Sequence, residues 1–132
     1  MRLATHFAAL IICISIFGSS TLADSIDSNL ARALELAGNN RTHIEMAAKN
    51  APADQQAAMT WQITHMPHRD LQTLSAQFLL DNCDEAFRAW RSAPWHERVS
   101  QEMFFDCILP YACINETRDE WRKTCIGRKA CR

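Results

Sequence analysis

The sequence predicts an all-α protein, a single irregular bundle of five or six helices. Apolar residues recur at spacings of three and four, which places them on one face of a helix. No run of alternating β-branched residues is present, and the period of two that marks a half-buried strand is absent. Only three glycines occur among the 132 residues. These features together favour helices throughout.

The first residues predict a signal peptide over residues 1–23. Arg2 supplies a basic start, and an apolar run from Phe7 to Phe17 follows it. Thr21-Leu22-Ala23 then places small residues where a signal peptidase cleaves. The apolar run is too short to cross a bilayer, for which about 20 residues are needed, and an uncleaved anchor is the alternative. We therefore expect an exported protein, periplasmic or extracellular, with no membrane contact after cleavage.

Residues 24–123 are expected to form one helical domain. This length suits a modest core and is short for two domains. The whole chain carries 14 Lys and Arg against 15 Asp and Glu, a formal net charge of −1. Because nucleic-acid binding usually requires a basic face, we expect no nucleic-acid partner.

Three helices are expected in the first half of this domain. Gly38 closes the first, and Asn40 is expected to cap the second. Pro52 suits the first turn of the third, with Asp54 near the positive end of that helix. The apolar positions of the three helices are Ile26, Leu30, Ala33, Leu34 and Ala37, then Ile44, Ala47 and Ala48, then Met59, Ile63 and Met66.

The longest helix is expected from about Leu71 to Arg91. Pro67 interrupts the chain before it, because a proline pushes the preceding residue, Met66, away from helical angles. Asp70 is expected to cap this helix. Its apolar residues form two faces, and a helix of this kind usually lies at the centre of a fold. The faces are Leu71, Leu74 and Phe78, and Leu80, Cys83, Phe87 and Trp90.

Two shorter helices are expected after a loop over residues 92–99. Ser100 caps the first of them and Pro110 ends it. Asn115 is expected to cap the last, which carries Trp121. The apolar residues of the first short helix are Met103, Phe104, Cys107 and Ile108.

The cysteines are expected to be structural. Cys83 and Cys107 occupy helical positions that an apolar residue could fill, and free cysteine behaves as a small buried hydrophobe. A cysteine nucleophile with His65 or His96 as its base is the competing interpretation. Cleavage of the signal peptide leaves an odd number of cysteines, which argues mildly against a disulfide framework. These are Cys83, Cys107, Cys113, Cys125 and Cys131.

The histidines and carboxylates give no strong signal for a site. His65 and His68 have H-x-x-H spacing, but Pro67 lies between them and no third ligand stands nearby, so we expect no metal. A carboxylate cluster could act as an acid and base pair, but two arginines follow at i+3 to i+7 spacing and favour exposed ion pairs. The acidic residues are Asp81, Asp84 and Glu85, and the arginines are Arg88 and Arg91.

The remaining candidate features of the sequence are two N-glycosylation sequons and four tryptophans. Asn40-Arg41-Thr42 and Asn115-Glu116-Thr117 match the sequon, although helix capping is the expected role of each asparagine. The tryptophans are expected to anchor the core or a contact with another domain. They are Trp61, Trp90, Trp95 and Trp121. No catalytic, cofactor-binding or metal-binding residue is assigned.

An ordered series of short segments resembles one protein family. The segments are LELAGNNR (34–41), HMP (65–67) with DL (70–71), SAQFLLDN (75–82), AWR (89–91) with PW (94–95), EMF (102–104), ILPY (108–111), NE (115–116) and RDEWR (118–122). Together they resemble the helical region before the catalytic domain in exported bacterial transglutaminase-like proteins of the papain-like superfamily. The resemblance covers residues 30–123. Each segment is weak alone, and their order and spacing carry the match.

The resemblance implies a non-catalytic N-terminal accessory region. In that family a downstream domain supplies a cysteine nucleophile, a histidine base and an aspartate, which perform acyl transfer or amide hydrolysis. None of those residues transfers to this sequence. The expected partner is such a catalytic domain, with self-association as a further possibility. The alternative is a stand-alone secreted helical module that binds another protein through a tryptophan-rich surface.

The sequence departs from the family pattern in two places. Cys83 and Cys107 stand where the family shows bulkier residues. After Lys123, residues 124–132 (TCIGRKACR) are basic and unpatterned where the family continues a helix. A premature end, from a frameshift or a split gene, is the hypothesis. Its rival is a short secreted protein whose tail is held by a disulfide of Cys113, Cys125 or Cys131.

Overall fold

The computed structural model describes residues 20–112 and 116–126, and this part of the chain is helical with no strand. The all-α expectation is confirmed. The α-helices are α1 (Ser20–Leu36), α2 (Arg41–Asn50), α3 (Gln56–His65), α4 (His68–Leu71), α5 (Ala76–Ser92), α6 (Gln101–Met103) and α7 (Trp121–Ile126). The 3-10 turns η1 (Gly38–Asn40) and η2 (His96–Arg98) and the π-helix η3 (Phe104–Ile108) complete the described part.

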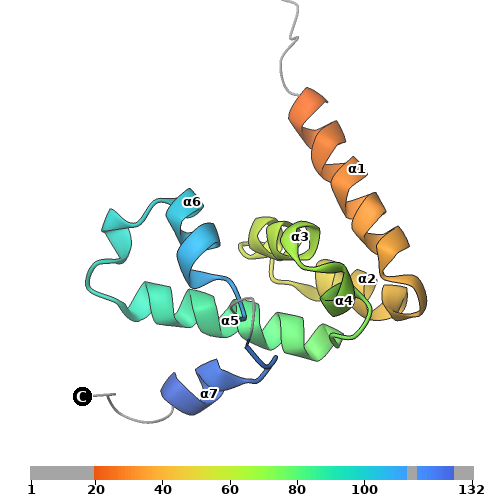
Figure 1. The fold of residues 1–132 in the computed structure, drawn as a ribbon. Coiled ribbons are helices and arrows are strands. Elements are labelled where there is room, and N and C mark those ends of the chain that lie inside the picture. Colours follow the sequence, from red (N-terminus) through yellow and green to blue (C-terminus); the bar gives the residue numbers. More distant parts are fainter. Residues whose placement is uncertain (1–19, 113–115, 127–132) are drawn as a thin grey trace, which may run out of the picture.

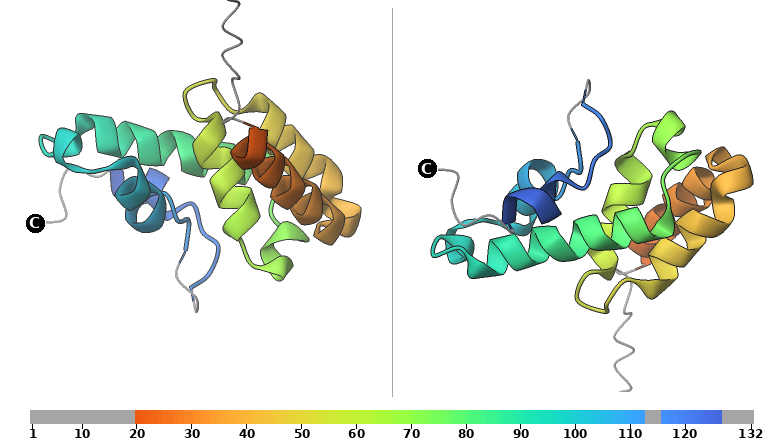
Figure 2. Two further views of the ribbon diagram at one scale, coloured as in Figure 1. Left: turned by 90° about the horizontal axis from the view of Figure 1, so that it is seen from above. Right: turned by 90° about the horizontal axis from the view of Figure 1, so that it is seen from below.

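Helix α5 is the central helix of the fold. Helices α2 and α3 contact α5, and α1 packs against α2, α3 and α4 (Figures 1 and 2). The later elements η2, η3 and α7 also contact α5. Leu79, Cys83 and Ala86 of α5 are each fully buried. The long helix is therefore central as expected, but two residues of one expected apolar face, Leu71 and Leu74, lie outside it.

In the connection between α1 and α2, the expected role of Gly38 is confirmed and the expected role of Asn40 is wrong. Gly38 ends α1 with a φ of +54°, the left-handed conformation that favours glycine. Asn40 does not cap α2 with its side chain. Its Nδ2 donates instead to the carbonyl oxygens of Leu71 and Leu74, each at 2.8 Å. The side chain therefore ties η1 to the end of α4.

The third helix begins later than expected. Residues 53–55 form a turn, in which the N–H of Gln55 donates to the carbonyl oxygen of Pro52 at 2.8 Å, and α3 starts at Gln56. Pro52 therefore lies before the helix. Asp54 pairs with Arg91 of α5.

The expected helix over residues 71–91 is two helices. Pro67 does end α3, with Met66 extended, but α4 stops at Leu71 and α5 starts at Ala76. Ser75 caps α5, because its Oγ accepts from the N–H of Phe78 at 3.1 Å. The assignment of Asp70 as the cap is wrong, since its carboxylate has distant partners that are described below.

The segment from Ser100 to Pro110 contains a π-turn. Ser100 caps α6 as expected, with its Oγ accepting from the N–H of Met103 at 3.2 Å. The N–H of Leu109 then donates to the carbonyl oxygen of Phe104 at 2.9 Å, which makes a five-residue turn. This turn brings Leu109 onto the buried side with Phe104 and leaves Cys107 exposed. The expectation of a buried Cys107 is wrong for this reason.

The structure describes the expected signal peptide and the C-terminal part of the chain only in part. Residues 1–19 of the expected signal peptide and Asn115 lie outside the described residues, and α1 begins at Ser20. The last helix starts at Trp121 and its backbone continues to Ile126, three residues into the stretch expected to be unpatterned. None of the described helices is long and apolar enough to span a membrane.

Candidate functional site

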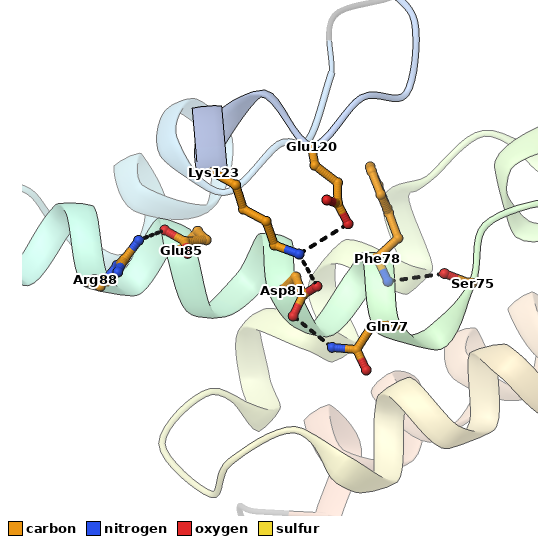
Figure 3. Close-up of polar contacts among 8 residues, drawn as sticks. All are labelled: Ser75, Gln77, Phe78, Asp81, Glu85, Arg88, Glu120 and Lys123. Atoms are coloured by element: carbon orange, nitrogen blue, oxygen red, sulfur yellow. Dashed lines mark hydrogen bonds and ion pairs between the residues drawn. The ribbon is translucent and has the colours of Figure 1, made fainter. Parts of the chain in front are cut away.

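Residues 116–123, which we name the C-terminal clasp, cross α4 and α5 and carry three cations. Arg118, Arg122 and Lys123 each reach a partner between 12 and 48 residues away. Figure 3 shows Lys123 reaching from α7 to the carboxylate of Asp81 on α5. The clasp therefore fixes the C-terminal part of the described chain onto α4 and α5.

Arg122 is the buried anchor of the clasp. Its side chain is only 6% exposed and donates to the carbonyl oxygens of Ile108 and Pro110 and to Oδ1 of Asn82. The carbonyls at the end of a helix lack partners within that helix, and a cation there satisfies them. Burial lowers the pKa of Arg122 to about 10, so the guanidinium keeps its charge at neutral pH.

Asn82 completes this polar network inside the core. Its Nδ2 donates to the carbonyl oxygen of Leu109 at 2.9 Å and to Oε1 of Gln62 at 3.1 Å. Both amide side chains are buried. Hydrogen bonds offset the cost of burying an amide. Those of Asn82 join α3, α5 and the end of η3 at one point, while Nε2 of Gln62 has no partner among the described residues.

A second buried network holds the start of the clasp. Oδ2 of Asp70 accepts from the hydroxyl of Tyr111 at 2.7 Å and from Nε and Nη2 of Arg118 at 3.0 and 2.9 Å. Burial and the hydrogen bond to Asp70 raise the pKa of Tyr111 well above its ordinary value. The hydrogen bonds that Arg118 itself donates to Asp70 raise the pKa of the guanidinium. A charge pair with one buried partner is costly to break.

The acidic cluster on α5 forms ion pairs, but mostly with other elements. Glu85 pairs with Arg88 as expected, while Asp81 pairs with Lys123 at 2.5 Å (Figure 3). Burial alone would raise the pKa of Asp81, but hydrogen bonds from Lys123 and Gln77 outweigh it and lower the pKa. The expectation of pairing within α5 is therefore correct for Glu85 alone.

Asp84 and Arg91, the other two charged residues expected to pair within α5, also contact other elements. Asp84 accepts from Nε2 of Gln55 at 3.3 Å, and Arg91 pairs with Asp54 in the turn before α3. These contacts join α5 to the segment that precedes α3.

An open groove of about 990 Å³ lies between the clasp, η3 and α5. Ile108, Pro110 and Ala112 contribute apolar surface to it, with Trp121 at one wall. Trp121 is 43% exposed although its Nε1 donates to the carbonyl oxygen of Tyr111 at 2.8 Å and its ring lies 4.3 Å from the guanidinium carbon of Arg122. The indole is thus held in place with one side open, as a contact anchor requires.

The two described thiols differ sharply. Cys83 is fully buried, and burial followed by the negative charges of Asp84 and Asp54 raises its pKa to about 12. A thiol nucleophile needs a lowered pKa and access to substrate, so Cys83 is unsuited to that role. Cys107 is exposed and lines the groove. The sulfur atoms of Cys113, Cys125 and Cys131 lie outside the described residues.

The histidines contact helix backbone. Nδ1 of His65 lies 2.8 Å from the carbonyl oxygen of Trp61, and the two rings stack with centroids 4.4 Å apart. Nε2 of His68 lies 3.1 Å from the carbonyl oxygen of Leu36. Among the described residues, no group of three or more His, Cys, Asp or Glu side chains is arranged to hold a metal ion.

The four tryptophans divide between core and surface. Trp61 and Trp90 pack against the core, and Trp90 lies 4.8 Å from Phe104 between ring centroids. Trp95 and Trp121 are 47% and 43% exposed. Only Trp121 lines the groove, which makes it the aromatic residue best placed for a contact with another protein.

Comparisons with known proteins found no match among protein-family models, curated proteins or solved structures. The resemblance to the helical region of transglutaminase-like proteins therefore rests on the quoted sequence segments alone.

Proposed function

We propose that this protein is a non-catalytic helical accessory domain of an exported transglutaminase-like system. It packs against a cysteine-dependent acyl-transfer or amidase domain and positions it. The observation that carries this proposal is the groove beside Trp121, a concave apolar surface with an aromatic side chain held half open at its wall. Aromatic anchors beside a pocket are typical of protein contacts.

The environment of Cys83 supports an accessory role. The side chain of Cys83 projects from α5 into the core. Its thiol has a pKa of about 12, so almost none of it is ionised at neutral pH. The buried anchors of the clasp also support it, because a docking surface has to keep its shape before the partner arrives. Arg122 and Asp70 provide that rigidity from inside the fold.

The proposal is tested by mixing the full chain with a purified transglutaminase-like catalytic domain encoded in the same genome. Sedimentation velocity should show a one-to-one complex. Cys107→Arg places a bulky charge in the groove and should weaken the complex at least about tenfold, a loss of about 1.4 kcal/mol. Met46→Arg is the matched control, because Met46 is also exposed but lies on α2.

Three results would reject the proposal. The first is the absence of any complex, and the second is an equal loss of affinity in both variants. The third is amidase activity of the chain alone that iodoacetamide abolishes. Specific binding of an unrelated exported protein through the same groove would instead favour the stand-alone binding module.

A further inference from the structure

We propose that the groove binds a basic segment of its partner, one in which lysine or arginine side chains flank a small apolar cluster. This inference rests on the proposed docking function and adds the chemistry of the partner. It follows from the charges along the groove and from the shape of the surface beside it.

The rim of the groove is acidic. The carboxylates of Asp106 and Asp119 line it, and no ion pair among the described residues neutralises either of them. Glu116 adds a third carboxylate. The cation that lines the groove is Arg122, whose N–H groups donate to Ile108, Pro110 and Asn82. An incoming segment therefore meets an excess of negative charge.

The acidic surface continues past the groove. Asp106 also lines a neighbouring hollow of about 410 Å³, together with Trp61, Phe105 and Glu102. Glu102 and Asp106 are both exposed, four residues apart. The two hollows therefore share one carboxylate and present apolar surface beside it.

Complementary charge decides between possible occupants. An acidic segment would be repelled by Asp106 and Asp119, and a neutral one would leave their charges uncompensated, whereas a basic segment pairs with them and gains faster association. The apolar parts of Trp121 and Ile108 suit the methylene chains of lysine and the side chains between them. A basic, partly apolar segment satisfies both surfaces.

The experiment uses the full chain labelled with ¹⁵N and two synthetic hexapeptides. One contains four lysines and two leucines, and the other has glutamate in place of each lysine. The indole N–H signal of Trp121, assigned with Trp121→Phe, and the amide signals of Asp106 and Cys107 are followed by NMR. The basic peptide should shift these signals to saturation, and the acidic peptide should leave them in place.

Charge variants separate the groove from the general charge of the protein. The double variant Asp106→Asn with Asp119→Asn should raise the Kd of the basic peptide about tenfold, because it removes the two rim charges with which the lysines pair. Glu35→Gln with Glu97→Gln removes the same charge from exposed positions on α1 and η2, and its Kd should stay within about twofold of the parent. Raising the salt from 20 to 150 mM should also weaken binding, since screening grows.

Several outcomes would overturn the inference. They are equal shifts with the acidic peptide, an unchanged Kd in the aspartate variant, and shifts confined to residues outside the groove. Movement of the groove signals with protein concentration and no peptide would assign the surface to a second copy. Because the peptide arm needs no catalytic domain, peptide binding without a complex would refute the proposed function and keep the basic specificity.

Discussion

Arg122 is the residue on which the geometry of the clasp depends. It is buried and donates to two backbone carbonyls and one side-chain amide, and no ion pair between described residues includes it. Removing a buried donor leaves its acceptors desolvated and unpaired. Arg122→Met should therefore lower the free energy of unfolding by about 3 kcal/mol, measured by urea denaturation.

Lys123→Met is the matched control for that variant. Lys123 is exposed, so solvent screens its ion pairs with Asp81 and Glu120, and losing them should cost much less stability than losing Arg122. Equal losses in the two variants would show that Arg122 does not anchor the clasp.

The two described cysteines should react at very different rates. With a pKa of about 12, roughly one Cys83 thiol in ten thousand is ionised at pH 8, and the side chain is also fully buried. Iodoacetamide should modify Cys107 in the folded protein and Cys83 only after unfolding. Peptide mass spectrometry of the alkylated chain measures this, and early modification of Cys83 would contradict the burial described.

Alkaline pH should destabilise the fold through Cys83 and Tyr111. Both have a pKa in the folded protein above the ordinary value. The folded state therefore holds protons that the unfolded state has released, and the free energy of unfolding falls as pH rises above about 9. The contribution of each group is at most about 1.4 kcal/mol per pH unit.

Variants isolate this effect from other alkaline titrations. Urea midpoints at pH 8, 9.5 and 11 should fall less steeply in Cys83→Val and in Tyr111→Phe than in the parent. Parallel pH profiles in all three proteins would show that neither group is responsible.

At the scale of elements, the start of α5 depends on Ser75. Its Oγ accepts from the N–H of Phe78, and loss of such a cap typically costs about 1 kcal/mol. Ser75→Ala should lower the thermal midpoint accordingly, while Ser75→Asp should restore it, because aspartate is an equally good cap. A Ser75→Ala variant as stable as the parent would contradict this assignment.

Local signals in the sequence predicted several of the helix boundaries. Gly38, Pro67 and Ser100 each act through the adjacent backbone, and each does so in the structure. Asp70 and Ser75 are both good caps by residue type, and local sequence does not distinguish them. Asp70 is diverted by Tyr111 and Arg118, more than 40 residues away, a choice that only tertiary contacts reveal.

The π-turn in η3 is a second feature that local sequence could not predict. An α-helical period places Cys107 near Phe104 and Ile108, whereas the five-residue turn puts Leu109 in line with Phe104. The end of this turn is satisfied by Arg122 and Asn82 from other elements. Because those donors are remote in sequence, periodicity alone could not predict that Cys107 is exposed.

At the scale of the whole molecule, the groove exists because three separate segments meet. Residues of α5, η3 and the clasp form its walls, and buried polar side chains fix their relative positions. The sequence pointed to Trp121 as an anchor of the core or of a domain contact. It could not place the acidic rim, because Asp106 and Asp119 come together only through the clasp.

Hydrogen exchange measures whether the groove docks a transglutaminase-like catalytic domain, as we propose. Amides of the full chain are compared with and without a saturating catalytic domain. Docking in the groove should slow exchange at least about tenfold in residues 105–112 and 117–122 and leave α2 unchanged. Protection confined to α1 and α2, or none at saturation, would contradict it.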